Sequence, residues 1–304
     1  MDFVNIFLKV FFLFFIIVIL FSVVFVTLLE RKVIGSLNVR VSPDWVVYMG
    51  LFQSVVDGLK LVGKKVVLIA FKREMKKDYI ISVLLLLVLF FFLWIWYLWG
   101  GGIVFFGRGI FWVFFILSCF IYVFLVLRKG RGNKYVLLSI FRVGSQVISY
   151  EVNLFFLFML FIISYWRWWV REENLSLDVK KVFFLGGVFL FLVIREMGRM
   201  PLDFLERESE LISGVNLEYG GVYFMIVFLV EYGKLIFIIM FILLMLCGIC
   251  YVIIIMRFIV MNVVVLIRGV FPRFRYDKLM FLCWKDLFFI LGVFMNIVIL
   301  RVLV

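Results

Sequence analysis

Residues 3–29 read FVNIFLKVFFLFFIIVILFSVVFVTLL, an apolar run in which Lys9 is the one charged residue. A helix that crosses the hydrocarbon core of a membrane needs about 20 mostly apolar residues, and this run exceeds that length. It is too long for the apolar core of a signal peptide, and no small-residue cleavage site follows it. We therefore predict a retained membrane-spanning helix over 3–29.

Seven further apolar runs follow the first one along the chain. They lie at 79–99, 110–127, 136–165, 180–197, 221–245, 250–270 and 284–303. The chain is 67% hydrophobic with a mean hydropathy of +1.25, whereas soluble domains are about half apolar. No extended repeat, linker or soluble domain separates the runs. The sequence therefore predicts an all-α membrane protein with about eight transmembrane helices in a single integral membrane domain, residues 1–304.

Basic residues are distributed unevenly between the loops, and the formal net charge is +13. The loops after the first, third, fifth and seventh runs hold 22 lysines and arginines. The opposite loops hold far fewer, namely Arg108, Arg167, Arg171, Lys180 and Lys181. Basic loops concentrate on the cytoplasmic or matrix side of a membrane, so we predict that both termini face the other side. Because the basic residues punctuate membrane spans, we predict no nucleic-acid partner.

The first long loop contains a second helical pattern. Its apolar residues recur at helical spacing, at Trp45, Tyr48, Met49, Phe52, Val55, Val56, Leu59 and Val62. The polar positions Gln53, Asp57 and Lys60 fall largely off that stripe, and Pro43 suits a helix start just before it. This pattern predicts an amphipathic helix in a matrix-side loop. It fits either a helix lying among the lipid headgroups or one that walls a cavity open to the bilayer.

Several ionisable residues fall inside or beside the predicted spans, namely Arg142, Glu151, Glu196, Glu231, Lys234 and Arg257. A charge in the bilayer costs about 3 kcal/mol on insertion scales, so such residues usually face the helix bundle and mark an ion or proton path. Glu231 and Lys234 are three residues apart on one helix face. An ion pair that merely holds helices together therefore remains the alternative.

The loop after the fifth run is acidic where the other matrix-side loops are basic. Its acids, counting the one just before it, are Glu196, Asp203, Glu206, Glu208, Glu210 and Glu218. Close carboxylates beside a membrane cannot all ionise, so some of their pKa values rise toward neutrality. Groups with such pKa values can take up and release protons. A solvated acidic loop is the alternative interpretation.

No element of the sequence predicts a bound metal or redox cofactor. The chain has no histidine, and Cys247 and Cys250 lie inside an apolar run, where we interpret them as small apolar side chains. There is no phosphate-binding loop, dinucleotide fingerprint or nucleophile elbow. Any electron chemistry must therefore come from a partner.

Motifs in several segments resemble one known family, and they occur in its order. They are ERKVIG (30–35), GLFQ (50–53) with DGLK (57–60), GNKY (132–135) with ISYE (148–151), RMPLD (199–203) with ERESEL (206–211) and NLEY (216–219), EY (231–232) and PRFRYD (272–277). Together they resemble subunit 1 of the proton-pumping NADH:quinone oxidoreductase, respiratory complex I. The sequence departs from the family pattern at Ser42-Pro43-Asp44, Arg195 and Arg207.

The resemblance implies a role beside partner subunits of the mitochondrial inner membrane. The chain would form the membrane part of a ubiquinone cavity and meet the hydrophilic quinone-module subunits on the matrix side. NADH, FMN and the iron–sulfur clusters would belong to those partners. Its acids would begin a path toward the small and antiporter-like membrane subunits, with lipids around them.

The residues expected to act fall into three groups. The proton path would use Glu151, Glu196, Glu206, Glu208, Glu210, Glu218 and Glu231. The quinone cavity or the interface to the hydrophilic arm would use Arg40, Gln53, Asp57, Lys60, Asp203, Arg273, Arg275 and Asp277. Structural charges would be Glu30, Arg142 and Arg199.

Two other classes compete with this interpretation. A stand-alone cation or proton transporter often shows inverted repeats, and we find none between the halves of the chain. In a purely structural anchor subunit the buried acids would be costly and would serve no purpose. Purification in mild detergent discriminates, because a transporter survives alone while a complex I subunit travels in a very large assembly.

Overall fold

The computed structural model describes residues 2–42, 44, 50–64, 73–100, 106–129, 134–171, 186–188, 191–192, 194, 221–247, 252–272 and 274–303. All regular structure in these residues is helical. The elements are α1 (Asp2–Leu37), α2 (Gln53–Gly63), α3 (Arg73–Gly100), α4 (Phe106–Lys129), α5 (Lys134–Arg171), α8 (Gly221–Cys247), α9 (Val252–Val270), α10 (Tyr276–Phe281), the π-helix η4 (Leu282–Leu287) and α11 (Phe288–Leu303).

The predicted apolar runs correspond to helices wherever the structure describes them. Helix α1 continues past the predicted end at residue 29 to Leu37. The last helix consists of α10, η4 and α11, which follow one another without a gap, and it starts at Tyr276 instead of residue 284. Of the fifth run, residues 186–188, 191–192 and 194 are described, and they are helical. The prediction of an all-helical protein is therefore confirmed for the residues that the structure describes.

Helix length and composition also indicate a membrane protein. Among the described residues three helices are long and apolar enough to cross a membrane, at Leu13–Leu37, Gly221–Phe241 and Tyr276–Ile297. Four shorter apolar helices lie at Ile80–Ile95, Phe111–Phe120, Gly144–Leu160 and Phe258–Val270. The number of eight crossings stays a prediction.

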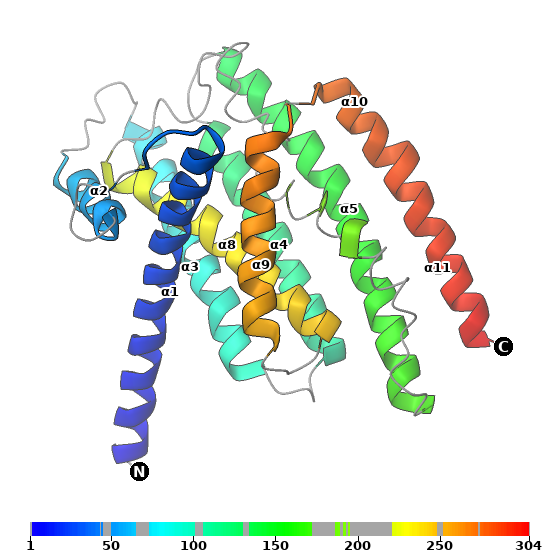
Figure 1. Cartoon of the computed structure of the whole chain (residues 1–304). Helices are drawn as coiled ribbons and strands as arrows, with labels where there is room; N and C mark the ends of the chain where they lie inside the picture. The colour runs from blue at the N-terminus through cyan, green and yellow to red at the C-terminus, as the bar shows by residue number, and fades with distance from the viewer. Residues whose placement is uncertain are drawn as a thin grey trace.

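The two ends of the chain lie at the same end of the molecule, and α2 and α10 lie at the opposite end (Figure 1). This arrangement agrees with an even number of crossings. Helix α8 runs obliquely through the bundle and packs against α1, α2, α3 and α9. Helix α5 contacts α4 on one side and η4 and α11 on the other.

The core between α3 and α8 is built from aromatic side chains. Phe90 and Phe237 are fully buried, and the ring centroids of Trp94 and Phe237 lie 5.7 Å apart in an edge-to-face arrangement. The ring of Phe90 occupies the space that a Cβ atom on Gly233 would need. A glycine at this position therefore lets the two helices approach closely, as small residues do at helix contacts in membranes.

The amphipathic helix begins later than the sequence pattern predicts. We expected it from Trp45, but α2 begins at Gln53, and residues 45–49 lie outside the described residues. Gly50 has a φ of 69°, a left-handed conformation that a regular right-handed helix does not contain. Helix α2 therefore does not extend back through Gly50.

Candidate functional site

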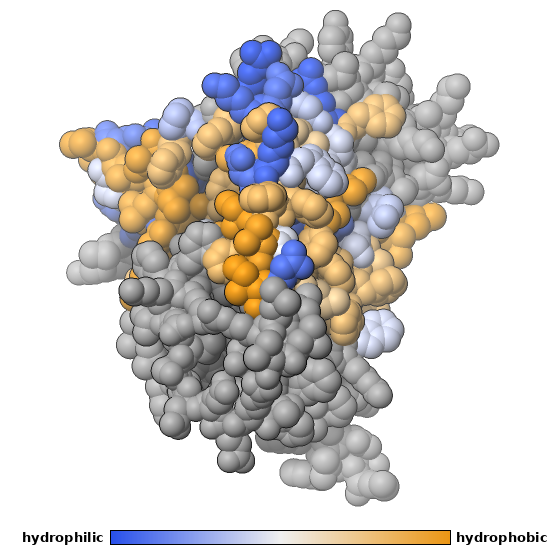
Figure 2. All heavy atoms as spheres, turned by 90° about the vertical axis from the view of Figure 1, so that its right-hand side faces the viewer, coloured by the Kyte–Doolittle hydropathy of each residue, from blue (hydrophilic) through white to orange (hydrophobic). Residues whose placement is uncertain are grey.

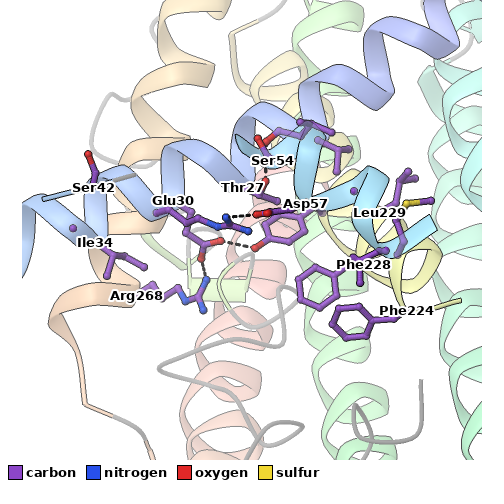
Figure 3. Close-up of a pocket in the computed structure, with 18 of the residues that line it drawn as sticks. Thr27, Glu30, Ile34, Ser42, Ser54, Asp57, Phe224, Phe228, Leu229 and Arg268 are labelled. Carbon is purple, nitrogen blue, oxygen red and sulfur yellow. Dashed lines mark hydrogen bonds and ion pairs between the residues drawn. The ribbon is translucent and has the colours of Figure 1, made fainter. Parts of the chain in front are cut away.

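A cavity of about 680 Å³ lies between α1, α2 and α8 (Figure 3). Its apolar wall comes from Val23 and Val24 of α1 and from Phe224, Phe228 and Leu229 of α8. Helix α2 contributes a second wall and Arg268, near the end of α9, a third. Small-molecule sites are usually concave and mostly apolar, with a few polar groups and volumes of about 300–1,000 Å³. The volume and the mostly apolar wall of this cavity both agree with such a site.

A charged cluster is buried in the wall of the cavity. The carboxylate of Glu30 forms an ion pair with Arg268 and accepts a hydrogen bond from the hydroxyl group of Tyr232. The side chain of Glu30 is 7% exposed and that of Arg268 is 16% exposed. These three residues join α1, α8 and α9 at one point, and Figure 3 shows Arg268 directed at Glu30. A buried charge requires such partners, because its desolvation is otherwise uncompensated.

A second ion pair ties α2 to α1. Arg31 Nη1 lies 2.7 Å from Asp57 Oδ2, and Gln53 Nε2 donates to Asp57 Oδ1 over 3.4 Å. This pair is partly exposed, so its contribution to stability is small. Helix α2 has no fully buried residue but lines the cavity through Ser54, Asp57, Gly58 and Leu61. Of the two alternatives for the amphipathic helix, the structure therefore favours the one that walls a cavity.

The predicted cavity and interface residues separate into two places. Arg40 and Asp57 line the cavity, Gln53 contacts Asp57, and Lys60 is an exposed residue of α2. Arg275 and Asp277 form a 3.0 Å ion pair at the start of α10, outside this cavity. The remaining two members of the group, Asp203 and Arg273, lie outside the described residues.

The predicted proton-path acids are described in part. Glu151 on α5 and Glu231 on α8 are half-buried, as is the structural charge Arg142. Glu151 lies close enough to Cys119 of α4 for electrostatic interaction. The other proton-path acids lie outside the described residues, namely Glu196, Glu206, Glu208, Glu210 and Glu218. The structural charge Arg199 also lies outside them. Their grouping stays a prediction.

Sequence reasoning missed the roles of two residues at the cavity. Arg268 was counted as a loop charge, and Tyr232 entered only as part of a motif. Tyr232 and Glu30 are 202 residues apart in sequence, so no local spacing brings them together. Glu30 lies at the end of an apolar run and Tyr232 inside another, and these positions alone do not identify a pair.

Polar side chains of α5 form hydrogen bonds with α10 and the π-helix η4. The hydroxyl groups of Ser145 and Tyr276 lie 2.7 Å apart, and the Tyr150 hydroxyl donates to the Leu279 carbonyl over 3.3 Å. One turn further, Asn153 Nδ2 donates to the carbonyl of Cys283 over 3.2 Å, in the π-helix. These hydrogen bonds join α5 to the end of the PRFRYD motif and to the helical residues after it.

Long apolar helices around a cavity with buried charges define a multi-helix membrane protein of the kind that moves ions or protons, or handles membrane-soluble substrates. A family model described as NADH dehydrogenase matches residues 9–300. The chain belongs to the NADH-ubiquinone oxidoreductase chain 1 family.

Individual relatives agree with this assignment over nearly the whole chain. The NADH-ubiquinone oxidoreductase chain 1 of Apis mellifera ligustica is 32% identical over 289 residues, which cover 92% of each chain. That of Aedes aegypti is 33% identical over 295 residues, 91% of this chain and 93% of its own. That of Artemia franciscana is 32% identical over 277 residues, 90% of this chain and 91% of its own. The family resemblance of the sequence motifs is thereby confirmed.

Proposed function

We propose that the chain forms the membrane-embedded wall of the ubiquinone cavity and the start of a proton-coupling path in NADH:ubiquinone oxidoreductase. Family membership makes it a subunit of that enzyme. The role at the quinone is supported by the cavity between α1, α2 and α8, whose wall contains the largely buried residues Glu30, Tyr232 and Arg268. A stand-alone cation transporter, the alternative from sequence, has no support in the family assignment.

The composition of the cavity wall suits a quinone. A quinone combines a polar headgroup, which accepts hydrogen bonds at two carbonyl oxygens, with a long apolar tail. The aromatic and aliphatic side chains of α1 and α8 offer an apolar surface to such a tail. Thr27, Ser54 and the Glu30 cluster supply the few polar groups that a headgroup would pass.

The proposal places the remaining chemistry in partner subunits. NADH, FMN and the iron–sulfur clusters belong to the hydrophilic arm, which meets the basic, matrix-side loops of this chain. Small and antiporter-like subunits adjoin it in the membrane. In this arrangement the chain is one integral domain of the mitochondrial inner membrane, crosses it eight times and keeps both termini in the intermembrane space. The basic residues of the loops after the first, third, fifth and seventh apolar runs support that orientation.

Filling the cavity tests the proposal. Thr27 lines the cavity from α1, and its hydroxyl group is satisfied by the carbonyl of Val24 at 2.7 Å. We expect Thr27→Trp to lower quinone-linked NADH oxidation severalfold and to raise the KM for a short-chain ubiquinone, because the indole takes up volume that the substrate needs. NADH oxidation by an artificial acceptor that bypasses quinone should persist in the same membranes.

Phe25→Trp is the matched control, since Phe25 lies one half-turn earlier on α1, is 47% exposed and is not part of the cavity wall. It should leave the quinone-linked rate unchanged. The two variants are compared at equal amounts of assembled enzyme. If Thr27→Trp and Phe25→Trp gave equal quinone-linked rates and KM values, the cavity would not be the substrate site.

A further inference from the structure

The last helix has one packed face and one open face. Leu279, Cys283 and Leu287 are buried toward the rest of the bundle, and the contacts of η4 and α11 with α5 lie on that side. On the open face Phe281 is 54% exposed, Trp284 50% and Phe289 69%. Large aromatic side chains left open in this way on a membrane helix require an apolar neighbour.

Two lysines stand on this open face. Lys278 precedes Phe281 by three residues and Lys285 follows it by four, and both lysines are exposed. The Lys285 ammonium lies 4.3 Å from the centroid of the Phe281 ring. Its side chain therefore reaches back one turn, toward the start of α10, as a lysine does when it snorkels out of the apolar layer.

The nearby acids leave both ammonium groups available. Asp277 is paired with Arg275, and Asp286 is exposed beside Lys285. Within the described part of the chain, neither lysine forms an ion pair. Figure 2, which faces this side of the molecule, shows hydrophilic side chains at the α10 end and a band of apolar side chains below them. Lys278 belongs to α10 and Lys285 to η4, and Phe289 follows them in α11.

We propose that this face, defined by Lys278, Phe281, Trp284, Lys285 and Phe289, binds an anionic glycerophospholipid. The phosphate lies between the two ammonium groups, and an acyl chain runs along the three aromatic rings. Charge complementarity selects this occupant, because the ammonium head of a zwitterionic lipid would face two lysines. The proposal uses the matrix-side orientation of α10 from the proposed function, and it does not depend on the quinone cavity.

Photo-crosslinking of the assembled complex tests the site. The probes are phosphatidylglycerol and phosphatidylcholine that carry the same photoreactive acyl chain, at matched concentrations. We expect phosphatidylglycerol to label the peptide 276–289 in preference to phosphatidylcholine. The double variant Lys278→Gln/Lys285→Gln should reduce that labelling by about thirtyfold, since each surface lysine contributes roughly a factor of five toward an anionic lipid.

Lys64→Gln removes another exposed positive charge, at the end of α2, and should leave the labelling unchanged. Thr27→Trp should also leave it unchanged, which separates this site from the quinone proposal. Equal labelling by the two lipids, or labelling that survives the double lysine variant, would overturn the proposal. A crosslink from Phe281 or Trp284 to a partner polypeptide in place of lipid would overturn it as well.

Discussion

Arg268→Leu should remove most of the assembled enzyme from the membrane. The substitution removes the guanidinium group that forms an ion pair with the buried Glu30 carboxylate, next to the hydroxyl group of Tyr232. Breaking a buried pair by removing one partner costs about 3–5 kcal/mol, which is a large part of the stability of a typical domain. Because Glu30 lies on α1 and Arg268 on α9, the loss separates two helices that form the cavity. Native gel electrophoresis with an in-gel NADH stain measures the amount of assembled complex.

The neighbouring pair supplies the control for this prediction. Arg31→Gln removes an arginine one residue along α1, but its pair with Asp57 is partly exposed and contributes at most about 1 kcal/mol. Assembly should therefore be nearly normal in Arg31→Gln. The double variant Glu30→Gln/Arg268→Leu should recover part of the loss, because both charges of this ion pair are then absent. If Arg268→Leu and Arg31→Gln gave equal amounts of complex, the buried cluster would have no structural importance.

Glu208→Gln and Glu231→Gln should each lower quinone-linked NADH oxidation and proton pumping together. Glutamine keeps the shape and hydrogen bonding of the side chain but cannot release a proton. Crowded carboxylates beside the membrane favour partial protonation, and the arrival of negative charge, such as an anionic quinol, changes how many protons they hold. The acids would in this way link the redox event to proton uptake without carrying electrons.

The amount of assembled complex, and NADH oxidation by an artificial acceptor, should be unchanged in both glutamate variants. These two measurements separate a defect in coupling from a defect in assembly. A solvated acidic rim would instead show only a small change in salt dependence. Full pumping and full quinone-linked activity in both variants would end the proton-path proposal and would leave the family assignment untouched.

The helical segments were predictable from sequence because apolar length alone decides them. Residues 3–29 and 221–245 contain enough apolar side chains to form helices whatever their neighbours are. The ends of helices were less predictable. Helix α1 continues through charged residues to Leu37, and α2 begins at Gln53 because the chain turns at Gly50, whose φ of 69° the apolar stripe does not reveal.

The cavity cluster could not be predicted, because it depends on which helices become neighbours. Arg268 at the end of an apolar run is equally consistent with a topology signal, a snorkelling side chain and a buried ion pair. The packing of α1 against α8 and α9 places Arg268 next to Glu30, so it forms a buried ion pair. Asp57 and Gln53, by contrast, were expected at the cavity because the GLFQ and DGLK motifs resemble those of the family. Asp57 lines the cavity and Gln53 contacts Asp57, while their role in quinone binding stays a prediction.

Photoaffinity labelling with an azido-ubiquinone tests the central claim most directly. If the cavity between α1, α2 and α8 is the quinone site, the probe should label peptides that contain Val23–Arg31 or Phe224–Tyr232, and excess ubiquinone should abolish this labelling. Labelling should also fall in the Thr27→Trp complex. Competable labelling confined to other segments of the chain, or labelling of these peptides that ubiquinone does not reduce, would contradict the account.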